Sequence, residues 1–147
     1  MVLRSLATNL ITEAGIALGA TASSPEEAVA LCGKMLVELG AISEPYVAAM
    51  WEREQTFPSA IGAGFASPHG TDESRSNVIF DQLVFLQLDQ PIAWGDEEVR
   101  CVLGIASRGE AHGDILGHLA DLLLEPENLE VFYHSKSKAE ILDLLTA

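Results

Sequence analysis

The residue in this sequence best suited to chemistry is His69, a single histidine in the segment GFASPHGT at residues 64–71. Pro68 fixes its own φ and restricts the residue before it, and the neighbouring glycines permit backbone conformations closed to other residues. The segment therefore predicts a stiff, exposed corner that presents one imidazole ring. An ordinary turn that happens to contain a histidine has a similar composition. This segment alone therefore leaves two interpretations open, a functional corner and an ordinary turn.

An arginine, Arg53, continues the apolar stripe of a helix predicted over residues 43–54. Tyr46, Ala49 and Met50 recur at helical spacing and define that stripe. A guanidinium on an inner face needs a partner, because burying a lone charge is costly. Two interpretations are open. In the first, the aliphatic stem of Arg53 packs against the core while its guanidinium reaches solvent at the helix end. In the second, the guanidinium binds an anion.

A helix predicted over residues 110–124 begins its apolar stripe with His112. The dipole at a helix N-terminus disfavours the imidazolium form, so we expect this ring to be neutral. His118 lies on the opposite stripe, where we expect it to pair in solvent with carboxylates. The acidic residues of that stripe are Asp114, Asp121 and Glu125.

These side chains favour the chemistry of phosphoryl transfer. A neutral imidazole carries a lone pair and can attack phosphorus without a general base. The spread negative charge of the transferring group suits an arginine fork and helix N–H groups. His69, His112 and Arg53 are therefore the candidate site residues. The sequence contains neither a Walker motif nor a carboxylate set for Mg²⁺, so a nucleoside triphosphate is not the expected donor.

Other kinds of site find less support in the sequence. Gly62 and Gly64 resemble the start of a dinucleotide-binding fingerprint, but Pro68 excludes the helix that must follow it. A metal hydrolase built on His69 and His112 needs a third inward ligand, which we do not find. We therefore expect no cofactor and no metal.

The composition indicates one globular domain over residues 1–147. Apolar residues make up 48% of the chain, which is enough for a substantial core. The formal net charge of −14 argues against nucleic acid or an anionic membrane as partner, because both require clustered basic residues. A basic protein is the kind of partner that this charge favours.

No apolar run approaches the length of a membrane-spanning helix. Asn9 and Glu13 interrupt the apolar N-terminal segment, so we expect no cleaved signal peptide. Cys32 and Cys101 lie singly in apolar surroundings, which predicts buried, inert thiols. Both observations favour a cytoplasmic protein.

Helices and strands alternate along the chain. A capping box from Ser24 to Glu27, with Pro25 at the first helical position, predicts the start of a helix that Gly40 ends. Further helices are predicted over 43–54, 110–124, 126–134 and 137–145, strands within 9–20, near 61–66, over 78–89 and over 99–107, a polar loop at 72–77 and a turn region at 91–98. The pattern predicts an α/β fold in which a mixed β-sheet lies between helices.

Three segments carry a resemblance to a known family. They are YVAAMWERE at 46–54, IGAGFASPHGT at 61–71 and AHGDILGHLADLL at 111–123. The sequence resembles, over nearly its whole length, the EIIA components of the bacterial phosphoenolpyruvate-dependent sugar phosphotransferase system, in the mannitol/fructose class. The acidic loop around Trp94 and the C-terminal segment are most similar to the mannitol branch.

The resemblance implies that His69 accepts a phosphoryl group from the phosphocarrier HPr at Nε2 and passes it to a cysteine of an EIIB component. His112 matches the second active-site histidine of the family, and Arg53 matches the residue that stabilises the phosphoryl charge. The family serves sugar uptake through an associated membrane component, EIIC. Two positions depart from the family pattern: Ser67 replaces an aliphatic residue, and Gly113 is smaller than the usual residue.

A second class of function remains open from the sequence. A regulatory module of the same fold would receive phosphate as a signal and bind other proteins rather than supply transport. The sugar is not specified either, because in this family selectivity resides mainly in the membrane component.

Overall fold

The computed structural model describes residues 10–108 and 112–146, with His112 described by its backbone only. Its centre is a five-stranded mixed sheet in the order β1-β4-β5-β3-β2. The strands are β1 (Ile16–Ala20), β2 (Ala60–Gly62), β3 (Phe65–Ala66), β4 (Gln82–Trp94) and β5 (Glu97–Ala106). β1 pairs with β4 and β3 pairs with β5 in parallel, whereas β4–β5 and β2–β3 are antiparallel.

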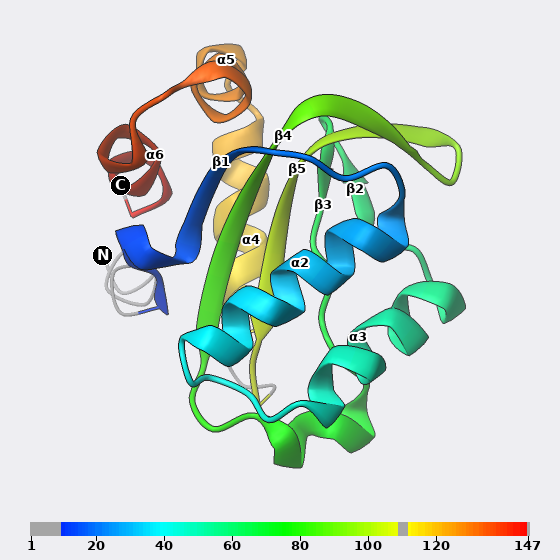
Figure 1. Ribbon diagram of the computed structural model, residues 1–147. Coiled ribbons are helices and arrows are strands. Elements are labelled where there is room, and N and C mark those ends of the chain that lie inside the picture. The colour runs from blue at the N-terminus through cyan, green and yellow to red at the C-terminus, as the bar shows by residue number, and fades with distance from the viewer. Residues whose placement is uncertain (1–9, 109–111, 147) are drawn as a thin grey trace.

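Helices cover both faces of this sheet (Figure 1). The described helices and 3₁₀ turns are η1 (Glu13–Gly15), α2 (Pro25–Glu38), α3 (Pro45–Thr56), η2 (Asp72–Asn77), α4 (His112–Leu123), α5 (Pro126–His134) and α6 (Lys138–Leu145). α2 and α3 pack on one face, and α4, α5 and α6 pack on the other. The predicted α/β architecture, a mixed sheet between helices, is confirmed.

Alternation along the central strands divides the core into two apolar layers. Val84 and Leu86 of β4 face the α2–α3 side, whereas Phe85, between them, faces the α4–α6 side. β5 follows the same rule, because Val102 and Leu103 belong to opposite layers. The prediction that the strand at 99–107 is covered on both faces is therefore confirmed.

The predicted helix start at Ser24 is confirmed, with one difference in detail. The Ser24 hydroxyl accepts a hydrogen bond from the Glu27 backbone N–H at 3.2 Å. The Glu27 carboxylate accepts from the backbone N–H of Ser23 at 2.8 Å, one residue earlier than the expected capping box. At α6, the Ser137 hydroxyl accepts from the Glu140 N–H in the same way.

Two predicted irregular regions are ordered, and one strand begins late. The turn predicted over 91–98 is present but much shorter than predicted. β4 continues to Trp94, and a tight turn at Gly95, with φ of 62°, leads directly into β5 at Glu97. The polar loop at 72–77 forms η2. The strand predicted from 78 begins at Gln82.

The late start of β4 has a clear cause in Arg108. Its guanidinium donates to the carbonyls of Val78 at 3.1 Å and Ile79 at 2.9 Å, and its backbone N–H donates to the Asp81 carboxylate. The backbone N–H of Ile79 also donates to the Ala41 carbonyl. These groups are satisfied outside the sheet, so residues 78–81 do not join it.

Both cysteines are fully buried and unpaired, as the sequence predicts. Burial raises the pKa of Cys32 to about 12 and also raises the pKa of Cys101. No helix within residues 10–108 and 112–146 is both long enough and apolar enough to cross a membrane.

Candidate active site

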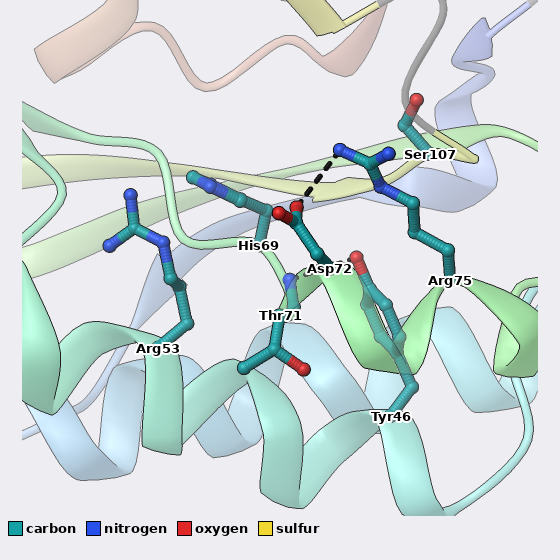
Figure 2. A pocket seen from close by; sticks show the side chains of 8 residues that line it. Tyr46, Arg53, His69, Thr71, Asp72, Arg75 and Ser107 are labelled. Atoms are coloured by element: carbon teal, nitrogen blue, oxygen red, sulfur yellow. Dashed lines mark hydrogen bonds and ion pairs between the residues drawn. The ribbon is translucent and has the colours of Figure 1, made fainter.

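A polar pocket of about 230 Å³ opens where α3, the segment after β3, η2 and the end of β5 meet (Figure 2). Its lining residues are Tyr46, Arg53, His69, Gly70, Thr71, Asp72, Arg75 and Ser107. Two of the three residues proposed from the sequence, His69 and Arg53, therefore share one pocket. The side chain of His112 lies outside the described residues, and the expectation that it joins them stays a prediction.

The imidazole of His69 is oriented by its own backbone. Nδ1 lies 3.1 Å from the carbonyl oxygen of Ser67. Because a carbonyl only accepts, Nδ1 carries the proton and donates this hydrogen bond. In the neutral ring the lone pair then belongs to Nε2. The local geometry of the corner thus selects the nitrogen that can act as a nucleophile.

Burial and a nearby positive charge keep the His69 ring neutral over a wider pH range than an ordinary histidine. Burial is the main influence that lowers the pKa of His69, and the nearby Arg53 guanidinium lowers it further. The hydrogen bond to Ser67 and the carboxylates of Glu54 and Asp72 act in the opposite direction. Since the net pKa is below its usual value, the nucleophilic form dominates at neutral pH.

The backbone around His69 is fixed to β5. His69 and Ile105 form an isolated parallel β-bridge, in which the Ile105 N–H donates to the Pro68 carbonyl at 2.9 Å. On the other side of His69, the Gly70 N–H donates to the hydroxyl of Tyr46 at 2.9 Å. The predicted stiffness of this corner is confirmed, and it comes from β5 as well as from Pro68. The predicted exposure is wrong, because Pro68 and Gly70 are buried and His69 is half-buried where the segment packs against β5 and α3.

Ser67 is buried within this corner. Its N–H donates to the Ser59 carbonyl at 3.1 Å, and its own carbonyl receives the His69 proton. Only 2% of the residue is exposed. A small residue therefore occupies the buried position whose carbonyl orients the imidazole.

Arg53 reaches the pocket from the last turn of α3 and is half-buried. Its Nη1 donates to the Phe57 carbonyl at 2.9 Å, and its guanidinium carbon lies 5.3 Å from the centre of the Phe57 ring. Figure 2 places its side chain on the same side of α3 as the His69 ring. The remaining guanidinium donors can bind an anion in the pocket.

The fully buried charge on α3 is Glu54, which the sequence reasoning missed. Its exposed fraction is 5%, and its Oε2 accepts hydrogen bonds from Ser59 N–H at 2.6 Å and Trp94 Nε1 at 2.7 Å. The spacing in the sequence could have indicated this burial, because Glu54 follows Tyr46 and Met50 at intervals of four residues on one helix face.

A second arginine, Arg75, was also missed. It lies in η2, on the other side of the pocket from Arg53, and pairs with Asp72 at 2.9 Å. The i, i+3 spacing of Asp72 and Arg75 is the sequence feature that could have indicated this pair, but the sequence predicts a polar loop over 72–77 and not the 3₁₀ turn that brings the two side chains together.

The prediction for His118 is wrong. Its Nε2 donates to the Leu145 carbonyl at 3.0 Å, so the ring ties α4 to the end of α6 instead of pairing with solvent-exposed carboxylates. The α4 face that the sequence leaves polar is covered in part by α6, and the ring is half-buried there.

The pocket thus combines an oriented neutral imidazole with a half-buried guanidinium. An imidazole lone pair can attack an electrophilic phosphorus, and arginine can neutralise the charge that arrives with it. Among the side chains that the structure describes, no three histidine, cysteine, aspartate or glutamate residues are grouped to hold a metal ion.

Comparison with known proteins agrees with this chemistry. A mannitol-specific phosphotransferase enzyme IIA component from Halalkalibacterium halodurans is 41% identical over 94% of each chain. One from Staphylococcus aureus (strain Mu50) is 38% identical over 91% of this chain and 93% of its own. The crystal structure of IIA mannitol from Escherichia coli superposes with a TM-score of 0.86, at 34% identity over 92% of this chain and 98% of that one.

The family model described as phosphoenolpyruvate-dependent sugar phosphotransferase system, EIIA 2, matches residues 9–147. This match spans every strand and helix described above. The chain therefore belongs to the EIIA 2 family of the phosphoenolpyruvate-dependent sugar phosphotransferase system.

Proposed function

We propose that His69 Nε2 accepts a phosphoryl group from HPr and donates it to a cysteine of an EIIB component, in the uptake of mannitol or a related sugar alcohol. The observation that carries this proposal is the hydrogen bond from His69 Nδ1 to the Ser67 carbonyl, which leaves the lone pair on Nε2. A solved complex of the mannitol enzymes IIA and phosphorylated IIB from Escherichia coli contains a chain similar to this one, with a TM-score of 0.87. That likeness supports EIIB as the acceptor.

In the proposed step, the Nε2 lone pair attacks phosphorus while the bond between phosphorus and the donor breaks. The electron pair of that bond remains on the donor. The phosphorylated ring keeps its Nδ1 proton and becomes cationic, and the Ser67 carbonyl stabilises that charge. Arg53 neutralises charge on the phosphoryl oxygens, and His112 is the proposed second hydrogen-bonding group. Transfer to EIIB reverses the sequence, with a thiolate as the attacking group.

The partners and location follow from charge and from the family. The formal charge of −14 favours docking against a basic face of HPr. We propose that residues 1–147 act as one cytoplasmic domain that meets its EIIC component only through EIIB. No bound cofactor enters this scheme, because the partner proteins supply and remove the phosphoryl group.

A regulatory role is the second candidate. The nitrogen regulatory protein IIA-Ntr from Neisseria meningitidis shares the fold, with a TM-score of 0.79, but at 20% identity this likeness concerns the fold alone. Relatives at 34–41% identity are mannitol-specific components, which favours transport.

The test is phosphorylation in a reconstituted relay. The protein is incubated with phosphoenolpyruvate, enzyme I and HPr, and its intact mass is measured before and after brief acid treatment. We expect one acid-labile phosphoryl group on the wild type and none on His69→Ala, whereas His134→Ala keeps it. An undiminished mass gain in His69→Ala would exclude His69 as the acceptor.

The transport and regulatory candidates are separated by a second step. The phosphorylated protein is mixed with a mannitol-type EIIB, and the loss of its phosphate is followed with time. Rapid transfer to the EIIB cysteine supports the transport role. Retention of the phosphate, with binding to EIIB absent, favours the regulatory role.

A further inference from the structure

The hydroxyl of Tyr46 connects two backbone segments that flank the pocket. It accepts a hydrogen bond from the Gly70 N–H at 2.9 Å and donates one to the Ile105 carbonyl at 3.0 Å. Gly70 directly follows His69, and Ile105 is the bridge partner of His69 on β5. The tyrosine therefore joins the residue after the nucleophile to the strand beside it.

The arrangement resembles one step of a parallel β-ladder with a side chain inserted. On the N-terminal side of His69, the Ile105 N–H bonds directly to the Pro68 carbonyl at 2.9 Å. On the C-terminal side, the Tyr46 oxygen stands between the Gly70 N–H and the Ile105 carbonyl. Both backbone neighbours of His69 are thus tied to the same residue of β5.

The phenol is built into the protein interior. Only 2% of Tyr46 is exposed, and it extends from the first turn of α3 toward the pocket (Figure 2). Burial raises the pKa of Tyr46, so the hydroxyl keeps the proton that it donates to the Ile105 carbonyl. The hydrogen bonds to Gly70 and Ile105 have sequence separations of 24 and 59 residues, so no local pattern produces them.

Gly70 is fitted to this ring. A Cβ at Gly70 would lie 2.4 Å from Cε1 of Tyr46 and 2.5 Å from Oγ of Ser74. Gly70 does not have a positive φ, so the glycine is needed for space rather than for backbone conformation. The phenol ring therefore accounts for the absence of a side chain immediately after His69.

We propose that Tyr46 is a positioning residue for phosphoryl transfer, which acts by holding the Pro68-His69-Gly70 backbone against β5 so that Nε2 faces the incoming phosphorus. This inference rests on the proposed role of His69 as the acceptor. Tyr46 does not touch the reacting atoms. It fixes the peptide on the C-terminal side of His69, whereas the Ser67 carbonyl fixes the ring itself.

The loss of such positioning has a specific kinetic signature. In Tyr46→Phe the ring still fills its space, but the Gly70 N–H and the Ile105 carbonyl lose their shared partner. Docking of HPr is unaffected, because a buried hydroxyl contributes nothing to the outer surface. The limiting rate of phosphorylation should therefore fall, while the donor concentration at half-maximal rate stays the same.

The matched control is Tyr133→Phe. The hydroxyl of Tyr133 also donates to a backbone carbonyl, that of Ala63 in the turn between β2 and β3, but it does not line the pocket. Both variants remove one oxygen from a tyrosine that bonds to backbone. Only the Tyr46 variant removes it beside His69.

The experiment measures single-turnover phosphorylation by phosphorylated HPr over a range of HPr concentrations, together with amide exchange of Gly70 by NMR. We expect Tyr46→Phe to lower the limiting rate about ten- to a hundredfold with an unchanged half-saturating concentration and faster Gly70 exchange. The limiting rate of Tyr133→Phe should stay within about twofold of the wild-type rate. That change is far smaller than a tenfold change in rate, which corresponds to about 1.4 kcal/mol in the activation barrier. An unchanged limiting rate in Tyr46→Phe, or an equal fall in both variants, overturns the inference.

Failure of the underlying function looks different. If the wild type itself gains no phosphoryl group, the proposed role of His69 fails, and the positioning role fails with it. The Gly70 exchange rate still reports then whether the Tyr46 hydroxyl restrains this backbone. If the wild type is phosphorylated and Tyr46→Phe is phosphorylated at the same limiting rate, the positioning role alone is contradicted.

Discussion

Trp94 donates its indole N–H to the Oε2 of Glu54 over 2.7 Å, although the two residues are 40 positions apart in sequence. Trp94 ends β4 and Glu54 lies in the last turn of α3, next to Arg53. The same carboxylate oxygen accepts the N–H of Ser59 at 2.6 Å. The end of α3 that presents Arg53 is therefore anchored to the tip of the β4–β5 hairpin.

Replacing this buried carboxylate should destabilise the protein. In Glu54→Gln the charge-assisted bonds to Trp94 and Ser59 become neutral ones, and the amide NH₂ takes the place of Oε1, which is buried and has no hydrogen-bond partner. We expect a loss of about 1–3 kcal/mol in the free energy of unfolding, measured by urea denaturation. Glu52→Gln, on the exposed face of the same helix, should stay within about 0.5 kcal/mol of wild type.

The link between the two residues can be isolated by combining Glu54→Gln with Trp94→Phe. If the hydrogen bond is the origin of the effect, the double variant should be less destabilised than the sum of the single variants, with a coupling of about 0.5–3 kcal/mol. Strict additivity would show that the indole and the carboxylate act independently.

Arg53 should matter for phosphoryl transfer more than for stability. Its guanidinium has donors beyond the one bonded to the Phe57 carbonyl, and it lines the pocket with His69. We expect Arg53→Gln to slow phosphoryl transfer about a hundredfold, which is the effect of removing one hydrogen-bond donor to the developing negative charge in other enzymes. Arg53→Lys should recover part of the rate, because it keeps the positive charge but not the planar guanidinium. Single-turnover kinetics with phosphorylated HPr measure both. Arg100→Gln, which removes an arginine outside the pocket, is the control.

The pKa of His69 determines the pH profile. Because burial and Arg53 lower this pKa, the neutral fraction stays high at a pH where an ordinary histidine, with a pKa near 6.5, is half protonated. We expect the ring signals in an NMR titration to have a midpoint below that of the same residue in urea-unfolded protein. The phosphorylation rate should fall only below this lower midpoint. A midpoint at or above the unfolded value would contradict the burial of the ring.

The same shift links stability to pH. The unfolded chain binds the His69 proton more tightly than the folded protein, so stability increases with pH in this range. The contribution of His69 is fully present above the unfolded pKa and is lost as pH falls through the folded pKa. Urea denaturation at several pH values should therefore show a slope below pH 6.5 that is smaller in His69→Ala.

Glycines of this fold separate into two groups by the space around them. A Cβ at Gly113 or Gly117 of α4 meets nothing within 4 Å, so alanine should stabilise each position by about 0.5–1 kcal/mol through helix propensity. A Cβ at Gly104 lies 2.9 Å from Cys32 Cβ and 2.9 Å from Val84 Cγ2. Gly104→Ala should therefore cost about 1–3 kcal/mol by overpacking, and thermal unfolding distinguishes the two signs.

The acidic surface predicts a salt effect on partner encounter. With a formal charge of −14, the protein attracts a basic docking face over distances comparable to the Debye length, which is about 10 Å at 0.1 M salt. The second-order rate of phosphorylation by HPr should fall as salt rises, while the limiting rate changes little. Stopped-flow measurements between low and high salt test this expectation, and a second-order rate that ignores salt would contradict it.

The parts of the site that the sequence predicts are those set by local chain chemistry. The helix start at Ser24 and the stiff corner at His69 both follow from short-range preferences of serine, proline and glycine. The burial of β5 on both faces likewise follows from its continuous apolar content, and the alternation of side chains along the strand divides the core into two layers.

The missed features depend on contacts between distant segments. Glu54 is buried because Trp94 reaches it from the hairpin, and His118 is half-buried because the end of α6 lies against it. Tyr46 reads as an ordinary core residue until Gly70 and Ile105 are brought to its hydroxyl. No periodicity in the sequence encodes these pairings, which arise only when the elements pack.

The burial of Cys32 and Cys101 has a consequence for the fidelity of the relay. Both residues are wholly enclosed, and their raised pKa values leave almost no thiolate at neutral pH. A thiol in that state is not a phosphoryl acceptor, even though the proposed next carrier uses a cysteine. Neither Cys32 nor Cys101 is therefore a competing acceptor for the phosphoryl group, and the sulfur that receives it has to lie outside residues 1–147.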